Sequence, residues 1–529
     1  MKYLLLCFPI FILFSCAQFI PPTGGENDKK APELISSSPL NKSKNFKEKS
    51  ISLTFNEYLD ITSIKQELLI TPEPKSLYNV KLKDKIIKII FDEKLDSNTT
   101  YTFNFRNGIK DLNEKNPAKN LKIVLSTGNK IDSLSISGTI TDIHTKMPIL
   151  EATIGLYSIK DTVSILKRKP NYFTKTDSSG KYQFENIKNN KYIVLAFSDK
   201  NQNLIYDTKT ETIGFLKDTI NLDSNLVNIN LEIYKANYSK NKIKRSISRD
   251  NSFVVQLDKE IIKTKIIFQD TKDSLDYSFN TNTVTFFKIK PISKDTIYAI
   301  LIVTDSLNII DTLNQKIYFT PTNNTNKKKV LQNLSIISNI KNGENLNSKI
   351  LYDIKFEYPI TEFDTSKIVF KTDTLQTEKP LFKFKNSTNL NILINTKAKK
   401  QIELFFPSNT IKNYKGDTNT MFYIKNTILL KENLGVIAGN IKNKKGNKIV
   451  QLLNAENYEL IYEQATNDKF EFKDLIPGLY LIKTIYDENK NGIWDPGNFA
   501  TGKQPENISL KKELIRVRAN FEIKDIELN

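Results

Sequence analysis

One spacing of oxygen-bearing side chains occurs twice in the chain and could bind a metal ion. The pattern is Asp-x-Asn-x-Asn-x-x-x-Asp, and its members are Asp199, Asn201, Asn203 and Asp207 in the first copy and Asp487, Asn489, Asn491 and Asp495 in the second. Oxygens at alternate positions of a tight loop converge on Ca²⁺ in EF-hand loops, where a backbone carbonyl adds a further ligand. Each copy has only two carboxylates and lacks a Glu at the twelfth position. The pattern therefore predicts weak calcium sites, with dissociation constants on the order of 10⁻⁴ M or poorer.

The same pattern is also typical of an Asx-rich turn, in which these side chains bond to backbone N–H groups and hold two strands together. The sequence leaves both interpretations open. Gly492 follows Asn491 in the second copy, whereas Leu204 stands at the equivalent place in the first. A positive φ there costs a residue with a Cβ roughly 1 kcal/mol or more. The second loop is therefore the better calcium candidate.

Two aromatic side chains that each occur once offer further chemistry. Trp494 lies inside the second loop, at the position that Tyr206 occupies in the first. An exposed indole could stack against a sugar, but the equivalence with Tyr206 favours a ring that packs at the edge of its own sandwich. His144 lies in the polar run 141–146, which predicts a surface loop. A single His excludes a histidine zinc cluster and argues against a Ser-His catalytic pair.

Other catalytic patterns are weak. Glu57 and Asp60 have the residue types of a glycosidase pair, but nothing in the sequence positions them. The chain contains no glycine-rich phosphate loop. We therefore expect a protein that is not an enzyme and has no small-molecule substrate.

The chain is strongly basic, with a formal net charge of +19. Only six of its 78 Lys and Arg residues are Arg, although phosphate recognition favours the guanidinium fork. The lysines are spread along the chain, as expected of a solvated surface with lysines at strand edges. Attraction to an anionic membrane face or polysaccharide is the alternative. We expect no nucleic-acid partner.

The N-terminal stretch predicts a lipid anchor. Both cysteines, Cys7 and Cys16, lie in it, so the remaining chain forms no disulfide. Residues 4–14 form an apolar run that is too short to span a bilayer and has the length of a signal-peptide core. Residues 13–16 (LFSC) resemble a lipobox, which implies cleavage before Cys16 and its acylation; an ordinary secretory signal is the alternative. The expected segments are a lipoprotein signal peptide at 1–15 and a flexible tether at 16–30.

The rest of the chain predicts an all-β fold, a string of about five β-sandwich domains. Residues 51–55 and 100–106 alternate apolar and polar side chains, and turn residues recur at the spacing of a sandwich. Residues 31–128 resemble the bacterial Ig-like domain of S-layer proteins, the SbsA type. The residues that carry this resemblance are 38–41, 53–57, 99–101 and 108–112.

A second type of module follows the first domain. Residues 129–234 resemble the prealbumin-like sandwich of carboxypeptidase regulatory and collagen-adhesin B modules, through 137–140, 177–184 and 192–197. This resemblance implies a structural module without an active site. The remaining expected domains are a divergent Ig-like domain at 235–324, an Ig-like domain at 325–429 and a second prealbumin-like module at 430–529.

The second module type is an internal repeat. Residues 181–184 (KYQF) align with 469–472 (KFEF) at an offset of 288, and the two loop motifs align at the same offset. Gly138 pairs with Gly439 at an offset of 301. The order of modules is thus A-B-A-A-B, which we expect to form a rod of five sandwiches.

These observations predict a lipid-anchored, non-catalytic envelope protein of a Gram-negative bacterium. We expect it on the outer membrane, facing the periplasm, because the residues after Cys16 lack both an inner-membrane retention Asp and an acidic surface-export cluster. There it would act as a spacer or scaffold that binds partner proteins of an outer-membrane assembly or secretion complex. A surface-displayed adhesin or glycan-binding lipoprotein is the alternative.

Overall fold

The computed structural model describes residues 28–159, 164–320, 333–373 and 379–528. Cys16, the lipobox and most of the tether therefore lie outside the described residues. The fold class is confirmed, because almost all regular structure in these ranges is β, apart from one short α-helix, α1 (Ile64–Glu67), and a few 3₁₀ turns. Within the same ranges, no helix has the length and apolar character needed to cross a membrane.

Domain 1 (residues 28–128) is an antiparallel sandwich. Its first sheet has the order β1 (Leu34–Ser38), β2 (Ser50–Phe55), β6 (Ile86–Phe91), β5 (Tyr78–Lys83). Its second sheet has the order β4 (Leu69–Thr71), β7 (Thr100–Asn104), β9 (Lys122–Ser126), and β3 (Leu59–Asp60) pairs separately with β8 (Lys110–Asp111). The alternation predicted in β2 is observed, since Ile51, Leu53 and Phe55 are all buried in the core.

Domain 2 (residues 129–236) is built on one continuous set of eight strands. Their order is β12 (Tyr172–Lys175), β11 (Thr153–Ser158), β14 (Asn190–Phe197), β15 (Thr212–Phe215), β17 (Leu231–Lys235), β10 (Leu134–Asp142), β13 (Lys181–Ile187), with β16 (Ile220–Leu222) paired to β14. The first and last long strands, β10 and β17, run parallel.

Domain 5 (residues 431–528) repeats this plan in two sheets. They have the orders β40 (Lys469–Leu475), β37 (Gly435–Ile441), β43 (Glu522–Leu528) and β39 (Leu460–Ala465), β38 (Asn447–Asn454), β41 (Gly478–Asp487), β42 (Ile508–Val517). Again the first and last strands, β37 and β43, run parallel. Gly138 lies opposite Tyr182, and Gly439 lies opposite Phe470, so the two copies share one register. At both glycines a Cβ would overlap a backbone carbonyl of the neighbouring chain segment, which explains why glycine stands there twice.

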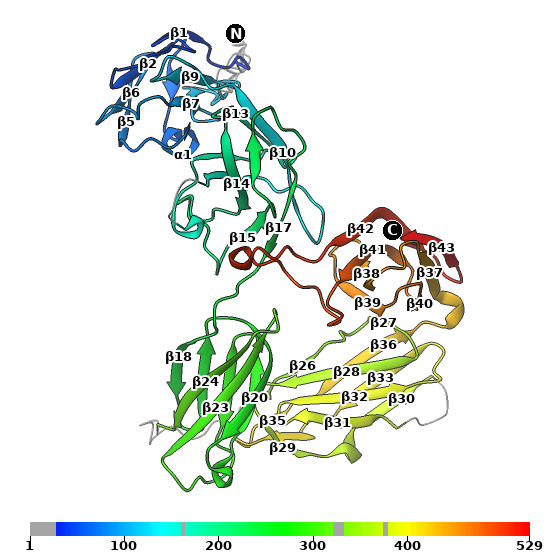
Figure 1. Ribbon diagram of the computed structural model, residues 1–529. Helices are drawn as coiled ribbons and strands as arrows, with labels where there is room; N and C mark the ends of the chain where they lie inside the picture. The colour runs from blue at the N-terminus through cyan, green and yellow to red at the C-terminus, as the bar shows by residue number, and fades with distance from the viewer. Residues whose placement is uncertain (1–27, 160–163, 321–332, 374–378, 529) are drawn as a thin grey trace, which may run out of the picture.

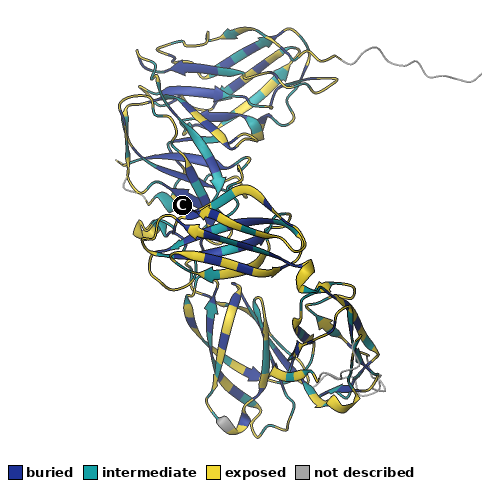
Figure 2. Ribbon diagram, turned by 90° about the vertical axis from the view of Figure 1, so that its right-hand side faces the viewer, coloured by how far each residue is buried: buried dark blue, intermediate teal, exposed yellow. Residues whose placement is uncertain are grey.

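Domains 3 and 4 are further sandwiches. Domain 3 (residues 237–320) has the sheets β18 (Ile243–Ser248), β19 (Ser252–Leu257), β22 (Thr283–Phe287), β21 (Asp276–Asn280) and β20 (Ile261–Phe268), β23 (Thr296–Asp305), β24 (Ile310–Tyr318). Domain 4 (residues 333–430) has three sheets, and the first has the order β26 (Ile336–Ser338), β28 (Lys349–Phe356), β32 (Asn389–Asn395), β31 (Leu381–Asn386). The second has the order β27 (Asn345–Leu346), β36 (Phe422–Ile428), β33 (Gln401–Phe406), β30 (Val369–Thr372). The third has the order β25 (Asn333–Leu334), β35 (Thr418–Asn419), β34 (Ile411–Asn413), β29 (Ile360–Phe363). Figure 2 shows the resulting alternation of buried and exposed residues along the strands.

The expected rod is wrong, because the chain folds back on itself. Domain 5 returns to domain 2, and a loop of domain 5 reaches the strands β15 and β17 (Figure 1). The two domains share one apolar cluster, whose buried members are Ile143, Tyr157, Leu195, Phe197, Tyr206, Ile213, Phe215, Tyr234 and Ala236 from domain 2 and Ile449, Ile485 and Ile508 from domain 5. Burial of these side chains stabilises a contact that a linear string of modules would leave exposed to water.

Other contacts hold the remaining domains. Arg106 of domain 1 forms an ion pair with Glu151 of domain 2. The first residues of domain 3, directly after domain 2, are held by Lys259, whose buried ammonium donates to the carbonyls of Asn237 and Ser239 at 2.9 Å each and pairs with Asp305. Domains 3 and 4 lie side by side in Figure 1, where the rings of Phe287 and Tyr414 meet at 6.0 Å between centroids.

Candidate functional site

The two oxygen-rich loops occupy equivalent places in the repeat. The first connects β14 to β15 and the second connects β41 to β42. In the second loop, the Asp487 carboxylate accepts backbone N–H bonds from Asn491 at 3.1 Å and Gly492 at 3.0 Å. In the first loop, Asp199 accepts the two equivalent bonds at 3.0 and 3.1 Å. Both loops therefore curl around their first aspartate.

The loops differ at their last aspartate. In the second loop, the side-chain amides of Asn489 and Asn491 both donate to Asp495, so all four predicted residues come together. In the first loop, Asp207 instead accepts from the backbone N–H of Lys209 at 2.8 Å and the hydroxyl of Thr210 at 3.0 Å. Its carboxylate is therefore engaged by the residues that follow the motif.

The geometry of both loops is that of a closed Asx turn, because the motif oxygens accept bonds from the chain itself. Among the described residues, no three His, Cys, Asp or Glu side chains gather as they would around a metal ion. Calcium binding by the pairs of Asp and Asn oxygens stays a prediction.

The backbone bends as the sequence predicted. Gly492 has a φ of 80°, and Leu204 adopts the same left-handed conformation with a φ of 61°. Glycine reaches this region freely, whereas a leucine is disfavoured by the close approach of its Cβ to the following carbonyl. The first loop is thus the more strained of the two.

A buried glutamate closes each loop, and the sequence analysis missed both. Glu211 accepts the backbone N–H of Lys200 at 2.8 Å and of Asp207 at 2.9 Å, and it is fully buried. The carboxylate thus bridges Lys200, near the start of the loop, and Asp207, the last residue of the motif. Such a residue lies outside the motif, so motif spacing alone does not reveal it.

Glu506 makes the same two bonds in the second loop. It accepts the backbone N–H of Glu488 at 2.8 Å and of Asp495 at 3.0 Å, and it is 3% exposed. Burial raises the pKa of Glu506, and the carboxylates of Asp495 and Asp487 act in the same direction, while its two N–H bonds lower the pKa. The glutamates stand 295 residues apart rather than 288, because the second loop is seven residues longer on this side. The repeat could have revealed them only through an alignment with this gap.

Trp494 packs across the boundary between the repeats. Its ring lies 6.0 Å from Tyr234 and 4.5 Å from His144, both in domain 2, measured between centroids. Its indole N–H donates to the backbone carbonyl of Glu506 at 2.9 Å. The side chain is half-buried and packs against the apolar cluster that domains 2 and 5 share. The expected packing within its own sandwich is thus replaced by packing against the other module.

His144 is not the exposed loop residue that its polar neighbours predicted. It is half-buried against Trp494, because domain 5 covers the turn that follows β10. Burial lowers the pKa of His144, and the positive charges of Lys483 and Lys146 lower it further, while Asp142 opposes them. The imidazole is therefore held in its neutral form against the indole ring.

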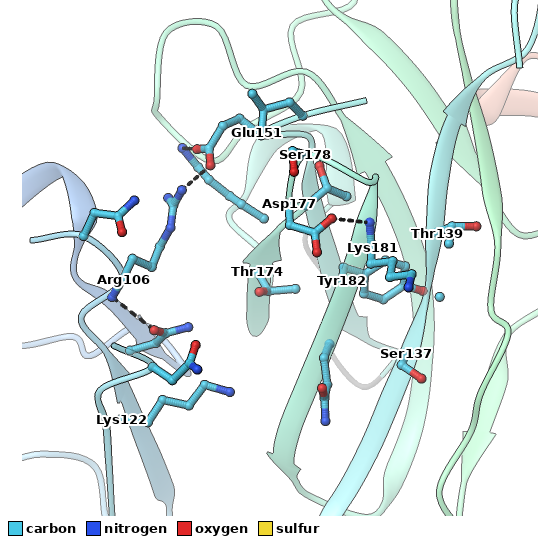
Figure 3. A pocket seen from close by; sticks show the side chains of 18 of the residues that line it. Arg106, Lys122, Ser137, Thr139, Glu151, Thr174, Asp177, Ser178, Lys181 and Tyr182 are labelled. Atoms are coloured by element: carbon cyan, nitrogen blue, oxygen red, sulfur yellow. Dashed lines mark hydrogen bonds and ion pairs between the residues drawn. The ribbon is translucent and has the colours of Figure 1, made fainter. Parts of the chain in front are cut away.

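A polar groove lies between domains 1 and 2 and has a volume of about 920 Å³. Its amide and hydroxyl side chains are those of Asn104, Asn107, Asn120, Ser137, Thr139, Thr174, Thr176, Ser178, Tyr182, Gln183, Asn228 and Asn230. In Figure 3, Arg106 extends from domain 1 toward Glu151 across the groove. Lys175 also pairs with Glu151, at 3.3 Å. The groove thus offers many neutral hydrogen-bonding groups beside the Arg106–Glu151–Lys175 ion pairs, and Lys119, Lys122, Asp177 and Lys181 also line it.

Comparison with known proteins supports the first domain. Residues 28–127 match a family described as a bacterial Ig-like domain, in agreement with the resemblance of 31–128. No curated protein matches the sequence.

Solved structures align with the chain only at a coarse level. The crystal structure of the S-layer protein rSbsC(31-844) covers 92% of this chain and 67% of its own, with 11% identity and a TM-score of 0.17. BcpA, the major pilin subunit of Bacillus cereus, covers 75% and 99%, with 12% identity and a TM-score of 0.13. The Bacteroides ovatus SGBP-B in complex with a mixed-linkage heptasaccharide covers 66% and 89%, with 11% identity and a TM-score of 0.17. Alignments at such TM-scores carry no argument about the function of this chain.

Proposed function

We propose that the protein is a lipid-anchored, non-catalytic scaffold of the bacterial envelope that binds partner proteins. The observation that carries this proposal is the packing of domain 5 on domain 2, which folds the string of domains 2 to 5 back into one closed arrangement. A fixed arrangement presents several sheet faces and interdomain grooves at constant distances from one another. This is what a protein needs to hold partners in a defined geometry.

The anchor is proposed from Cys16 and its lipobox, with attachment to the outer membrane and a periplasm-facing position. One acyl chain of a lipoprotein anchors only marginally, whereas two or more hold firmly. Cys16→Ala is therefore expected to move the protein from the membrane fraction to the soluble fraction or to leave it unprocessed. An unmodified Cys16 in the intact mass of the mature protein would overturn this assignment.

The periplasm-facing scaffold is tested by protease treatment of cells. Protease added to whole cells should leave the chain intact, and protease added to permeabilised cells should degrade it. Cross-linking in intact cells should then join the wild-type protein to the same envelope proteins in repeated experiments. Cleavage in whole cells would instead support the surface-displayed alternative.

That alternative, a glycan-binding lipoprotein, is favoured by one feature, the polar groove. Amide and hydroxyl groups from two domains suit the hydroxyls of a sugar chain. If the groove binds glycans, Asn107→Ala with Ser178→Ala should abolish binding on an oligosaccharide array, while Asn395→Ala should not. Absence of binding by the wild-type protein would leave the scaffold function alone.

A further inference from the structure

The outer face of one sheet in domain 4 carries a row of exposed leucines. Leu351 of β28 lies opposite Leu393 of β32, which lies opposite Leu381 of β31, so the three side chains form one line across three strands. Their exposed fractions are 46%, 42% and 62%. We refer to these three residues as the leucine row.

The leucine row departs from the pattern of its own sheet. The neighbouring position on the same face brings together Asp353, Asn391 and Lys383. On the other side of the row, Lys349 pairs with Asn395. A solvated face of an antiparallel sheet is normally polar throughout, as it is at these positions. The same face also carries the exposed side chain of Ile337 of β26, which lies opposite Lys355. The leucine row is therefore an apolar line between two polar positions of this face.

The row begins at a groove between domains 4 and 5, which we call the apolar groove. Leu351 lines it together with Ile461, Tyr462 and Ile476 of domain 5, and its volume is about 390 Å³. These three side chains are also exposed, at 39%, 36% and 39%. Ile461 and Tyr462 belong to β39, which is an edge strand of its sheet in the described part of the chain. Leu351 belongs to both the groove and the row, so the two adjoin each other at the boundary between domains 4 and 5.

The charges around this surface specify the partner's chemistry. Lys349, Lys355, Lys383 and Lys385 lie on the same outer face, where Asp353 lies 3.4 Å from Lys385, and Asp474 of domain 5 lines the groove. Four lysines against two carboxylates leave the rim positive, while its centre is apolar. An occupant must offer apolar side chains to the leucines and carboxylates to the lysines. The concave groove fits a narrow chain segment better than the flat surface of a bilayer.

We propose that the leucine row and the apolar groove bind an extended segment of a partner protein in which apolar and acidic residues alternate. An extended chain presents alternate side chains on opposite sides. One side can cover the leucines, and the long lysine side chains of the rim can extend past the segment to the carboxylates on its other side. The proposal deepens the scaffold function, on which it rests, by assigning one binding surface and the chemistry of its partner.

The test uses the whole mature chain and a synthetic peptide of twelve residues in which Glu and Leu alternate. Fluorescence anisotropy should show saturable binding of this peptide and none of a Lys-Leu peptide of the same pattern. The double variant with Leu351→Ser and Leu393→Ser should bind the peptide more weakly, by about tenfold or more for each leucine replaced. The reason is that each substitution removes most of the apolar area that the peptide would bury at that position. Ile310→Ser is the matched control, since Ile310 is 65% exposed on β24, outside this surface, and should leave binding unchanged.

Hydrogen exchange should map the site. Peptide binding is expected to protect backbone amides of β28 and β39 and to leave those of β24 unaffected. Equal binding of the Lys-Leu peptide, or unchanged binding by the double variant, would overturn the proposal.

Two other occupants are distinguished by parallel measurements. Sedimentation with phosphatidylglycerol vesicles that depends on Leu351 and Leu393, without peptide binding, would identify a membrane surface. Dimerisation in analytical ultracentrifugation that the double variant abolishes would identify a second copy of the chain. Either result would overturn the peptide assignment while leaving the anchor and orientation experiments unaffected.

Discussion

At the scale of single residues, one buried glutamate braces each of the two oxygen-rich loops. Glu211 and Glu506 each bond to two backbone N–H groups at opposite ends of their loop. A carboxylate accepts without donating, so both of its oxygens can serve N–H groups. Charge-assisted bonds of this kind are stronger than those between neutral groups.

Replacement of Glu506 by Gln should destabilise domain 5. The amide NH₂ must then face one of the two N–H donors, so one buried bond is lost, at a cost of about 1–3 kcal/mol in the free energy of unfolding. Denaturant unfolding of the whole chain measures this loss. Glu513→Gln, on the exposed part of β42, is the control and should change stability by less than about 0.5 kcal/mol. Equal stability of the two variants would contradict the bridging role.

Calcium at the second loop is tested by thermal unfolding. Ca²⁺ at about 100 times its dissociation constant would add about 2.7 kcal/mol to the stability of the bound module. We expect the domain 5 transition to lie higher in millimolar Ca²⁺ than in chelator, and Asp487→Ala to remove the difference. Asp199→Ala should preserve it, because the first loop carries the strained Leu204 and turns Asp207 away from the motif. Coincident curves for the unaltered protein would leave both loops as turns.

At the scale of elements, the turn after β10 and the loop before β42 form one unit. The turn supplies His144 and the loop supplies Trp494, whose rings are in contact. Neither element would be buried in an isolated module. The contact also places the only His of the sequence beside the only Trp. The titration of His144 can therefore be followed through the fluorescence of Trp494.

Acidification should loosen this contact. The pKa of His144 lies below its ordinary 6.5 because burial and Lys483 disfavour the imidazolium. The stabilisation is therefore complete above the ordinary pKa and is lost as the pH falls through the folded pKa. Trp494 emission should therefore shift to longer wavelengths as the pH falls below 6.5 and His144 becomes protonated. His144→Gln should abolish that shift, and an identical shift in this variant would assign the effect to carboxylates instead.

At the scale of the whole molecule, the interface between domains 2 and 5 sets the shape. Phe215 of domain 2 meets Phe499 of domain 5 at 5.1 Å between ring centroids. Gln504 of domain 5 donates to the carbonyl of Phe215 at 3.2 Å, and Tyr238, at the start of domain 3, donates to the carbonyl of Pro496 at 2.8 Å. These contacts join segments more than 250 residues apart in the chain.

Opening this interface should lengthen the molecule. Trp494→Ala with Phe499→Ala removes two half-buried rings, each contributing on the order of 1–3 kcal/mol. X-ray scattering should show a larger radius of gyration, while each domain keeps its own core and β-structure in circular dichroism. Tyr423→Ala, on an exposed face of domain 4, is the control. An unchanged radius would mean that other contacts hold the fold-back.

The sequence by itself determined the all-β class, the repeat and the bend at Gly492. These depend on local alternation, turn chemistry and backbone sterics, which short stretches of chain encode directly. Only the tertiary structure decided the burial of His144, the contacts of Trp494 and the two bridging glutamates. The leucine row also required it, because strand register brings Leu351, Leu393 and Leu381 together from separate strands. Long-range contacts depend on which apolar surfaces meet after the modules fold, and no spacing within one module specifies that choice.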